Sequence, residues 1–240
     1  MILEVYKSIG ESNGDIIKRI KQEYNCKKIC FAGRLDPMAH GLVIVLTDED
    51  VKNSDKYMYS GYKKYKFEFI VGFRTDSGDL LGLINKVDFE NTGNVVECAL
   101  KHDKQYNQQY HLFSSFLVNK KPLWWYGING VNINCDLPSK QVNIKNIDFL
   151  DERVMTSAQL KDYINDNLNT VPNNKYRKED IIECYDKHFA NNGDKEYNVF
   201  SFDITVSSGF YVRQFVQDIA DKLNLAMTTM SIYRYGFEYD

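Results

Sequence analysis

The loop-like segment from Ala32 to Gly41 carries the side chain best suited to catalysis, the carboxylate of Asp36. Asp36 stands directly before Pro37, and a residue before proline is held in an extended backbone. Gly33 and Gly41 allow tight turns on either side. A carboxylate on a rigid loop ahead of an apolar strand is well placed to act on a substrate. The alternative is an Asx turn in which Asp36 only bonds nearby backbone. The local residues leave both interpretations open.

A strand-to-helix junction near the far end of the chain, Ser207–Arg213, offers a partner for such a carboxylate. An arginine holds a carboxylate by charge-assisted hydrogen bonds and keeps it ionised. In the first turn of a helix, Arg213 is unfavourable with the helix dipole, which favours a partner elsewhere in the fold. The alternative is an ordinary surface arginine. Tyr211 lies two residues earlier.

Lysines flank an aromatic ring in the segment Lys63–Lys66, which has Tyr65 inside it. A basic strand edge with an aromatic side chain is suited to phosphate contact and base stacking. Alternatively, Tyr65 belongs to the core and the lysines are solvated. Residues 119–126 combine lysines and aromatics in a similar way, and such a cluster is more often core than ligand platform.

Charge, hydrophobicity and cysteine content limit the kinds of protein to which this chain can belong. The 240 residues carry 30 basic and 33 acidic side chains, a net charge of -3, so any contact with nucleic acid must rest on a local basic patch. The longest aliphatic run, Leu42–Leu46, is too short to span a membrane, and the first residues show no signal pattern. Five scattered cysteines, of which only Cys26 and Cys30 are close, predict reduced thiols in the cytoplasm and no metal site.

Hydrophobic periodicity predicts strands and helices in an irregular order. Apolar residues recur at helical spacing after a cap at Ser12 or Asn13, and again over residues 215–223. Alternation predicts strands over residues 65–71, 141–150 and 200–206. Asn129-Gly130 predicts a two-residue hairpin turn. Since regular βαβ alternation is absent, we expect an α+β fold with a mixed, mainly antiparallel central sheet and flanking helices.

One stretch departs from this pattern. Residues 155–188 are polar and helix-prone, and Thr156 and Gln159 have the spacing of a capping box. We expect residues 1–240 to form a single domain with a helical insertion at about residues 151–195.

Taken together, these segments resemble the TruB-type pseudouridine synthases. Residues 33–42 resemble the motif G-x-L-D-P-x-A-x-G-x, which carries the catalytic aspartate of that family. The other resemblances, in chain order, are residues 7–12 to K-P-x-G-x-[ST]-S, residues 64–66 to the K-x-Y segment, residues 72–79 to the T-D-T-x-D loop, residues 207–213 to S-K-G-T-Y-I-R, and residues 230–237 to the strand that closes the catalytic domain.

The resemblance implies a pseudouridine synthase-like fold and a role for each matching position. Asp36 is then the catalytic carboxylate, Arg213 its ion-pair partner and Tyr65 the ring stacked on the target uracil. The other expected substrate contacts are Tyr211, Met230, Lys64 and Phe31.

The implied reaction is the isomerisation of uridine to pseudouridine in structured RNA, with the T loop of tRNA as the first expectation and mRNA or another structured RNA as alternatives. Because the reaction conserves atoms and oxidation state, no cofactor is expected. We expect a monomer. The competing hypothesis is a non-catalytic protein that binds or folds RNA on the same scaffold.

Several positions depart from the family pattern. Cys30-Phe31 stands where a Gly-His pair is usual, so Phe31 is expected to take over the contact of that histidine with the RNA loop. Ser208 stands where lysine is common, Ser8 where proline is common, and Arg34 is unusual beside the aspartate. The sequence ends at Asp240, which leads us to expect no PUA domain, the module with which relatives grip tRNA.

Overall fold

The computed structural model describes residues 1–59, 61–89, 93–133, 136–173 and 176–238. Cys135, one of the five cysteines, lies outside these ranges. The helices are α1 (Asn13–Tyr24), the 3-10 helix η1 (Asp48–Asn53), α2 (Ser54–Tyr59), α3 (Val95–Leu100), α4 (Leu123–Asn129), α5 (Ser157–Asn169), α6 (Lys178–Asn192) and α7 (Val212–Leu223). The strands are β1 (Ile2–Lys7), β2 (Ile29–Phe31), β3 (Ala39–Thr47), β4 (Tyr62–Val71), β5 (Phe73–Thr75), β6 (Ile84–Val87), β7 (Gln105–Gln109), β8 (Leu117–Val118), β9 (Lys121–Pro122), β10 (Ser139–Thr156), β11 (Glu196–Ser207) and β12 (Met227–Glu238).

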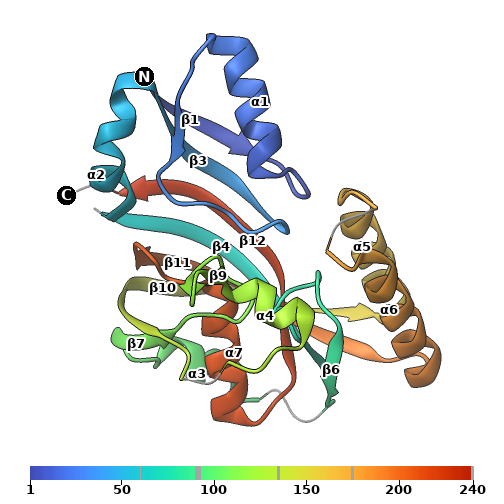
Figure 1. Ribbon diagram of the computed structural model, residues 1–240. Coiled ribbons are helices and arrows are strands. Elements are labelled where there is room, and N and C mark those ends of the chain that lie inside the picture. Colours follow the sequence, from blue (N-terminus) through green and yellow to red (C-terminus); the bar gives the residue numbers. More distant parts are fainter. Residues whose placement is uncertain (60, 90–92, 134–135, 174–175, 239–240) are drawn as a thin grey trace.

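The strands build one large sheet in the order β1-β3-β12-β4-β11-β10-β7, with β2 added beside β3. Only the β3–β12 pair within it is parallel among the described residues. The expected α+β fold with a mixed, mainly antiparallel sheet and flanking helices is therefore confirmed (Figure 1).

Aromatic side chains of adjacent strands hold the centre of the sheet together. Phe67 and Phe69 of β4 alternate with polar residues and are fully buried. The ring of Phe67 lies 5.7 Å from that of Phe202, and the ring of Phe69 lies 5.6 Å from that of Phe200. Phe215 of α7 meets Phe67 edge-on, so this helix covers the same face.

Helix α1 and the pair α5 and α6 pack against different parts of the sheet (Figure 1). Ile16 and Ile20 of α1 are buried beside Val43 of β3 in the main core. Helices α5 and α6 form a separate pair, packed through a second core that includes Ile164 and Val199. No helix among the described residues has the length and apolar composition needed to cross a membrane.

Both predicted helix starts are confirmed at the level of hydrogen bonds. Ser12 caps α1 by accepting from the backbone of Asp15, whose carboxylate accepts from the backbone of Ser12. Thr156 and Gln159 form the same reciprocal pair at α5.

Two sequence-based boundaries are corrected. The strand predicted to end at Leu150 continues to Thr156, because residues 151–156 pair with residues 196–201 of β11. The helical segment therefore spans residues 157–192 rather than beginning near residue 151. Its description as an insertion into a single catalytic domain, residues 1–240, stays a prediction.

The hairpin turn predicted at Asn129-Gly130 is wrong. Asn129 is the last residue of helix α4, and Gly130 caps it in the left-handed conformation, with φ 61°. A left-handed glycine serves a helix end as well as a type I′ turn, so the dipeptide alone does not decide between them. Burial of Leu123 and Tyr126, three residues apart on one helical face, decides for the helix.

Candidate active site

A cavity of about 1010 Å³ separates two halves of the molecule. Its floor is the middle of the sheet, where Tyr65 of β4 and Ile232 of β12 face it. One wall is formed by α1 and residues 29–39, and the other by residues 110–128 and 208–213. We refer to this cavity as the cleft.

Asp36 reaches the cleft from the loop between β2 and β3. Backbone and side-chain hydrogen bonds fix that loop: Gly10 N donates to Pro37 O at 2.9 Å, and Lys7 Nζ donates to Pro37 O at 3.2 Å and to Ala39 O at 2.7 Å. Burial lowers the pKa of Lys7 to about 8, although the negative charge of Asp36 acts to raise it. With 31% of its side chain exposed, Asp36 remains open to a ligand in the cleft.

Arg213 holds Asp36 from the first turn of α7. Its Nε donates to Asp36 Oδ2 at 2.9 Å and lies 3.5 Å from Asp79 Oδ2. The other guanidinium nitrogens donate to Ser77 O at 2.6 Å and Phe113 O at 3.2 Å. Burial alone lowers the pKa of Arg213, but the two carboxylates outweigh burial and raise it. They also compensate for its unfavourable place in the helix dipole.

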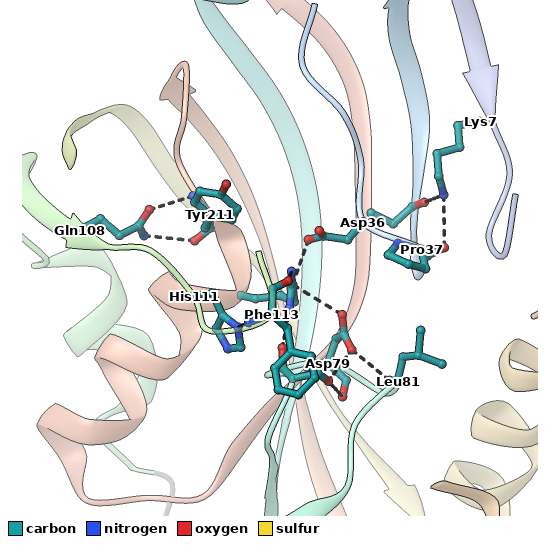
Figure 2. A network of polar contacts seen from close by, with 12 residues as sticks. Lys7, Asp36, Pro37, Asp79, Leu81, Gln108, His111, Phe113 and Tyr211 are labelled. Atoms are coloured by element: carbon teal, nitrogen blue, oxygen red, sulfur yellow. Dashed lines mark hydrogen bonds and ion pairs between the residues drawn. The ribbon is translucent and has the colours of Figure 1, made fainter. Parts of the chain in front are cut away.

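Asp79 is a second carboxylate at this site, and sequence reasoning gave it no role. It is nearly inaccessible, accepts from Ser77 Oγ at 2.7 Å and from Leu81 N at 2.9 Å, and approaches the same network as Asp36 (Figure 2). Burial raises the pKa of Asp79, and Arg213 opposes that rise. Asp36 and Asp79 therefore share one buried arginine, and only Asp36 is open to solvent.

Two tyrosines line the cleft beside the carboxylate. Tyr65 is 6% exposed, and its hydroxyl lies 3.4 Å from Arg234 Nη1. The backbone of Tyr211 is clamped by Gln108, which accepts from its N at 2.8 Å and donates to its O at 3.1 Å (Figure 2). Burial, aided by the negative charge of Asp36, raises the pKa of Tyr211 to about 12.

The structure brings five of the seven predicted site residues to the cleft, namely Asp36, Tyr65, Tyr211, Arg213 and Phe31. It leaves two away from it. Lys64 lies on the opposite face of β4 and forms an ion pair with Glu238 at 3.4 Å, because side chains of a strand alternate between faces. Its neighbour Lys63 faces the cleft instead. Met230 is buried in the second core with Phe73.

The helical segment also reaches the cleft, which sequence reasoning missed. Arg177, at the start of α6, donates to both carboxylate oxygens of Asp76, at 2.8 and 3.2 Å. Arg177 and its neighbour Tyr176 both line the cleft and both have positive φ, 58° and 60°. Such backbone is uncommon for residues with bulky side chains and is a frequent mark of a functional segment.

Positive charge gathers in the cleft although the whole chain is acidic. The basic residues that line it are Lys7, Arg34, Lys63, Lys140, Arg177, Arg213 and Arg234, and the acidic ones are Glu11, Asp36 and Asp79. This is the local basic patch that contact with a polyanion requires. Among the described residues, no three His, Cys, Asp or Glu side chains are grouped as metal ligands.

Comparisons with known proteins point to one family. Residues 21–164 match the model of the TruB family pseudouridylate synthase N-terminal domain. The tRNA pseudouridine synthase B of Lactococcus lactis subsp. cremoris MG1363 is 24% identical over 229 residues, which cover 94% of this chain and 58% of that protein. The protein of the same name from Mycoplasmopsis pulmonis is 31% identical over 154 residues, covering 62% of this chain and 54% of that protein. The chain thus spans little more than half the length of these relatives. For the relative of that name from Ureaplasma urealyticum, 25% identical, the share is 84%.

Solved structures agree in fold. A Cbf5-Nop10-Gar1 complex matches with a TM-score of 0.56 at 11% identity, covering 98% of this chain and 48% of the matched one. An H/ACA RNP bound to a substrate RNA containing 2'-deoxyuridine matches with a TM-score of 0.54 at 10% identity, covering 98% and 47%. With the family model matched over more than half of its residues, including Asp36, the chain belongs to the TruB family of pseudouridylate synthases.

Proposed function

We propose that this protein isomerises uridine to pseudouridine in a structured RNA. The observation that carries the proposal is the Asp36 carboxylate, held by Arg213 at 2.9 Å and open to a basic cleft that Tyr65 also lines. A protein that only binds RNA gains nothing from an exposed carboxylate paired with a buried arginine where phosphates must approach, so the catalytic hypothesis is favoured over the binding one.

The chemistry fits the groups at hand. The N1–C1′ bond of the uridine breaks, the base turns, and C5 bonds to C1′; C5 then loses a proton and N1 gains one, so nothing is left over. The sugar carbon becomes electron-poor as its bond to the base breaks, and the Asp36 carboxylate stabilises or traps it, or takes a proton from the sugar. The role of Arg213 is to orient that carboxylate, since its Nε donates to Asp36 Oδ2 at 2.9 Å.

The base must first leave its stack, which costs a few kcal/mol. Tyr65 offsets that cost by stacking on the extruded uracil, while Tyr211, rigid because Gln108 clamps its backbone, closes the other side of the base pocket. We expect Phe31, the last residue of β2, to contact the RNA around the target, because this residue lines the cleft.

We infer that the substrate is tRNA, at a uridine of the T loop, since relatives that match nearly the whole of this chain are named tRNA pseudouridine synthase B. We further propose that the protein acts as a monomer, because Asp36, Arg213 and Tyr65 line one cleft without a contribution from a second copy. The thiols of Cys26, Cys30, Cys98 and Cys184 are free, in keeping with the reducing cytoplasm.

The test is nucleotide-resolution mapping of pseudouridine in an unmodified tRNA transcript incubated with the protein. We expect one modified uridine in the T loop, and none with the Asp36→Asn variant. A transcript that stays unmodified, together with unchanged pseudouridine in total cellular RNA when the protein is removed, would refute the isomerase proposal.

A further inference from the structure

A second group of buried cations faces the cleft, apart from the pair of Asp36 and Arg213. Lys63 of β4 is 8% exposed and Arg234 of β12 is 1% exposed, and both line the cavity. In the part of the chain that the structure describes, no carboxylate lies within ion-pair distance of either. Their charge is therefore not balanced by the described side chains.

Hydrogen bonds bring a third cation to the same place. Lys63 Nζ donates to Ser208 Oγ at 3.0 Å, and Lys140 Nζ donates to Ser208 O at 2.9 Å, so two ammonium groups converge on one residue. Gly33 makes room for this approach: with φ 90° it adopts a conformation that side chains rarely allow, and a Cβ there would lie 2.8 Å from Lys63 Nζ.

Neutral acceptors hold Arg234 in position. Its guanidinium donates to Leu42 O at 2.6 Å, to Gly33 O at 3.2 Å and to Tyr65 Oη at 3.4 Å. These bonds fix its geometry but supply no negative charge. A buried cation without a counter-ion is costly, and the cost falls when an anion enters. In keeping with this, burial and then the charges of Arg234 and Lys140 lower the pKa of Lys63 to about 7.

We propose that Lys63, Lys140 and Arg234 form a subsite for a phosphodiester group of the RNA backbone next to the target uridine. This inference rests on the proposed function and gives the cleft a second point of attachment. Lys63 stands two residues from Tyr65 on the same face of β4, about 6.6 Å along the strand. The subsite therefore adjoins the base pocket rather than the outer rim of the cleft.

A binding measurement tests the subsite without turnover. In the Asp36→Asn background, the affinity for a synthetic hairpin of the T-arm sequence is measured against salt for the parent, for Lys63→Gln and for the matched control Lys64→Gln on the opposite face. We expect Lys63→Gln to weaken binding about tenfold or more and to reduce the slope of log Kd against log salt by about 0.7–0.9, the value for one lost phosphate contact. The control should match the parent.

A neutral methylphosphonate beside the target uridine locates the contact. The parent should lose affinity for this hairpin, whereas Lys63→Gln should lose little more, because the contact is already gone. If Lys63→Gln folds poorly, Lys140→Gln replaces it in the experiment, because Lys140 is less buried. This variant should reduce the slope in the same direction.

Three outcomes overturn the subsite: equal slopes for Lys63→Gln and Lys64→Gln, the same methylphosphonate penalty in parent and variant, or binding of inorganic phosphate with no methylphosphonate effect. The experiment distinguishes failure of the subsite from failure of the proposed function. Active parent protein with equal slopes removes only the subsite, and altered slopes in a protein that makes no pseudouridine remove only the isomerase proposal.

Discussion

Two buried cationic centres of the same cleft are neutralised in different ways. Arg213 meets the carboxylates of Asp36 and Asp79 within the protein. Lys63 and Arg234 line the same cleft, and among the described groups their hydrogen bonds go only to hydroxyl and carbonyl oxygens. The first arrangement sets a buried cation against a reactive carboxylate before substrate arrives. The charge of the second arrangement is balanced only when an anion binds. The first centre therefore serves the reaction, and the second serves the attachment of the RNA.

The largest effect should come from the charge at the first centre. Asp36→Asn preserves size and removes the negative charge, so isomerisation should fall by at least about 10²–10⁴-fold, while RNA affinity stays nearly unchanged. Single-turnover pseudouridine formation and filter binding on the same transcript measure the two quantities. Activity equal to the parent would remove Asp36 from the mechanism.

Removing the cation of the first centre should damage both stability and activity. Arg213→Ala leaves Asp79 buried without its partner, and breaking a buried pair costs about 3–5 kcal/mol. Urea denaturation measures this loss. Asp79→Asn added to Arg213→Ala should restore part of the stability but none of the activity, since Asp36 still lacks its partner. If the double variant is no more stable than Arg213→Ala, Asp79 is not the charge that Arg213 balances.

The pairing at the first centre was predictable because each half carries a local signal. Pro37 and the flanking glycines mark Asp36, and an awkward place in a helix dipole marks Arg213. Asp79 stands in the segment that resembles the T-D-T-x-D loop, but no local physical signal predicts its burial. Its burial depends on the loop after β5 folding back so that Ser77 and Leu81 can donate to it, and only tertiary structure decides that.

The prediction for the second centre was displaced by one residue, since it named Lys64 where Lys63 faces the cleft. The sequence places three lysines and a tyrosine along Lys63–Lys66, but which lysine faces the cleft follows from the pairing of β4 with β11 and β12. A one-residue difference exchanges the faces, so Lys63 took the place predicted for Lys64. The contribution of Arg177 was hidden for a related reason, since a polar helical segment gives no sign of what it lies beside.

Tyr65 contacts Arg234 of the second centre and lines the same cleft as Asp36, and its variants separate stacking from hydrogen bonding. Tyr65→Ala should weaken capture of the target base by about 1–3 kcal/mol, the range for stacking of one base. Tyr65→Phe keeps the ring and loses only the contact with Arg234, so it should be milder. Single-turnover rates at saturating and limiting RNA measure both. A Phe variant as inactive as the Ala variant would assign the hydroxyl a chemical role.

The smallest effect should be a change in how stability depends on pH. The pKa of Lys63 is about 7 in the folded protein, below its usual value of 10.5, because of burial and then the charges of Arg234 and Lys140. Below pH 7 both states hold the proton and the full cost of burying the charge is present. Between about pH 7 and 10 the unfolded chain binds more protons than the folded one, so stability gains up to about 1.4 kcal/mol per pH unit from this lysine.

Lys63→Met removes that gain, whereas Lys64→Met retains it. Urea denaturation of the RNA-free protein at several pH values should therefore give a flatter curve for Lys63→Met alone. Parallel curves for all three proteins would mean that the pKa of Lys63 is not lowered and that its charge is already balanced, and the contrast between the two centres would disappear.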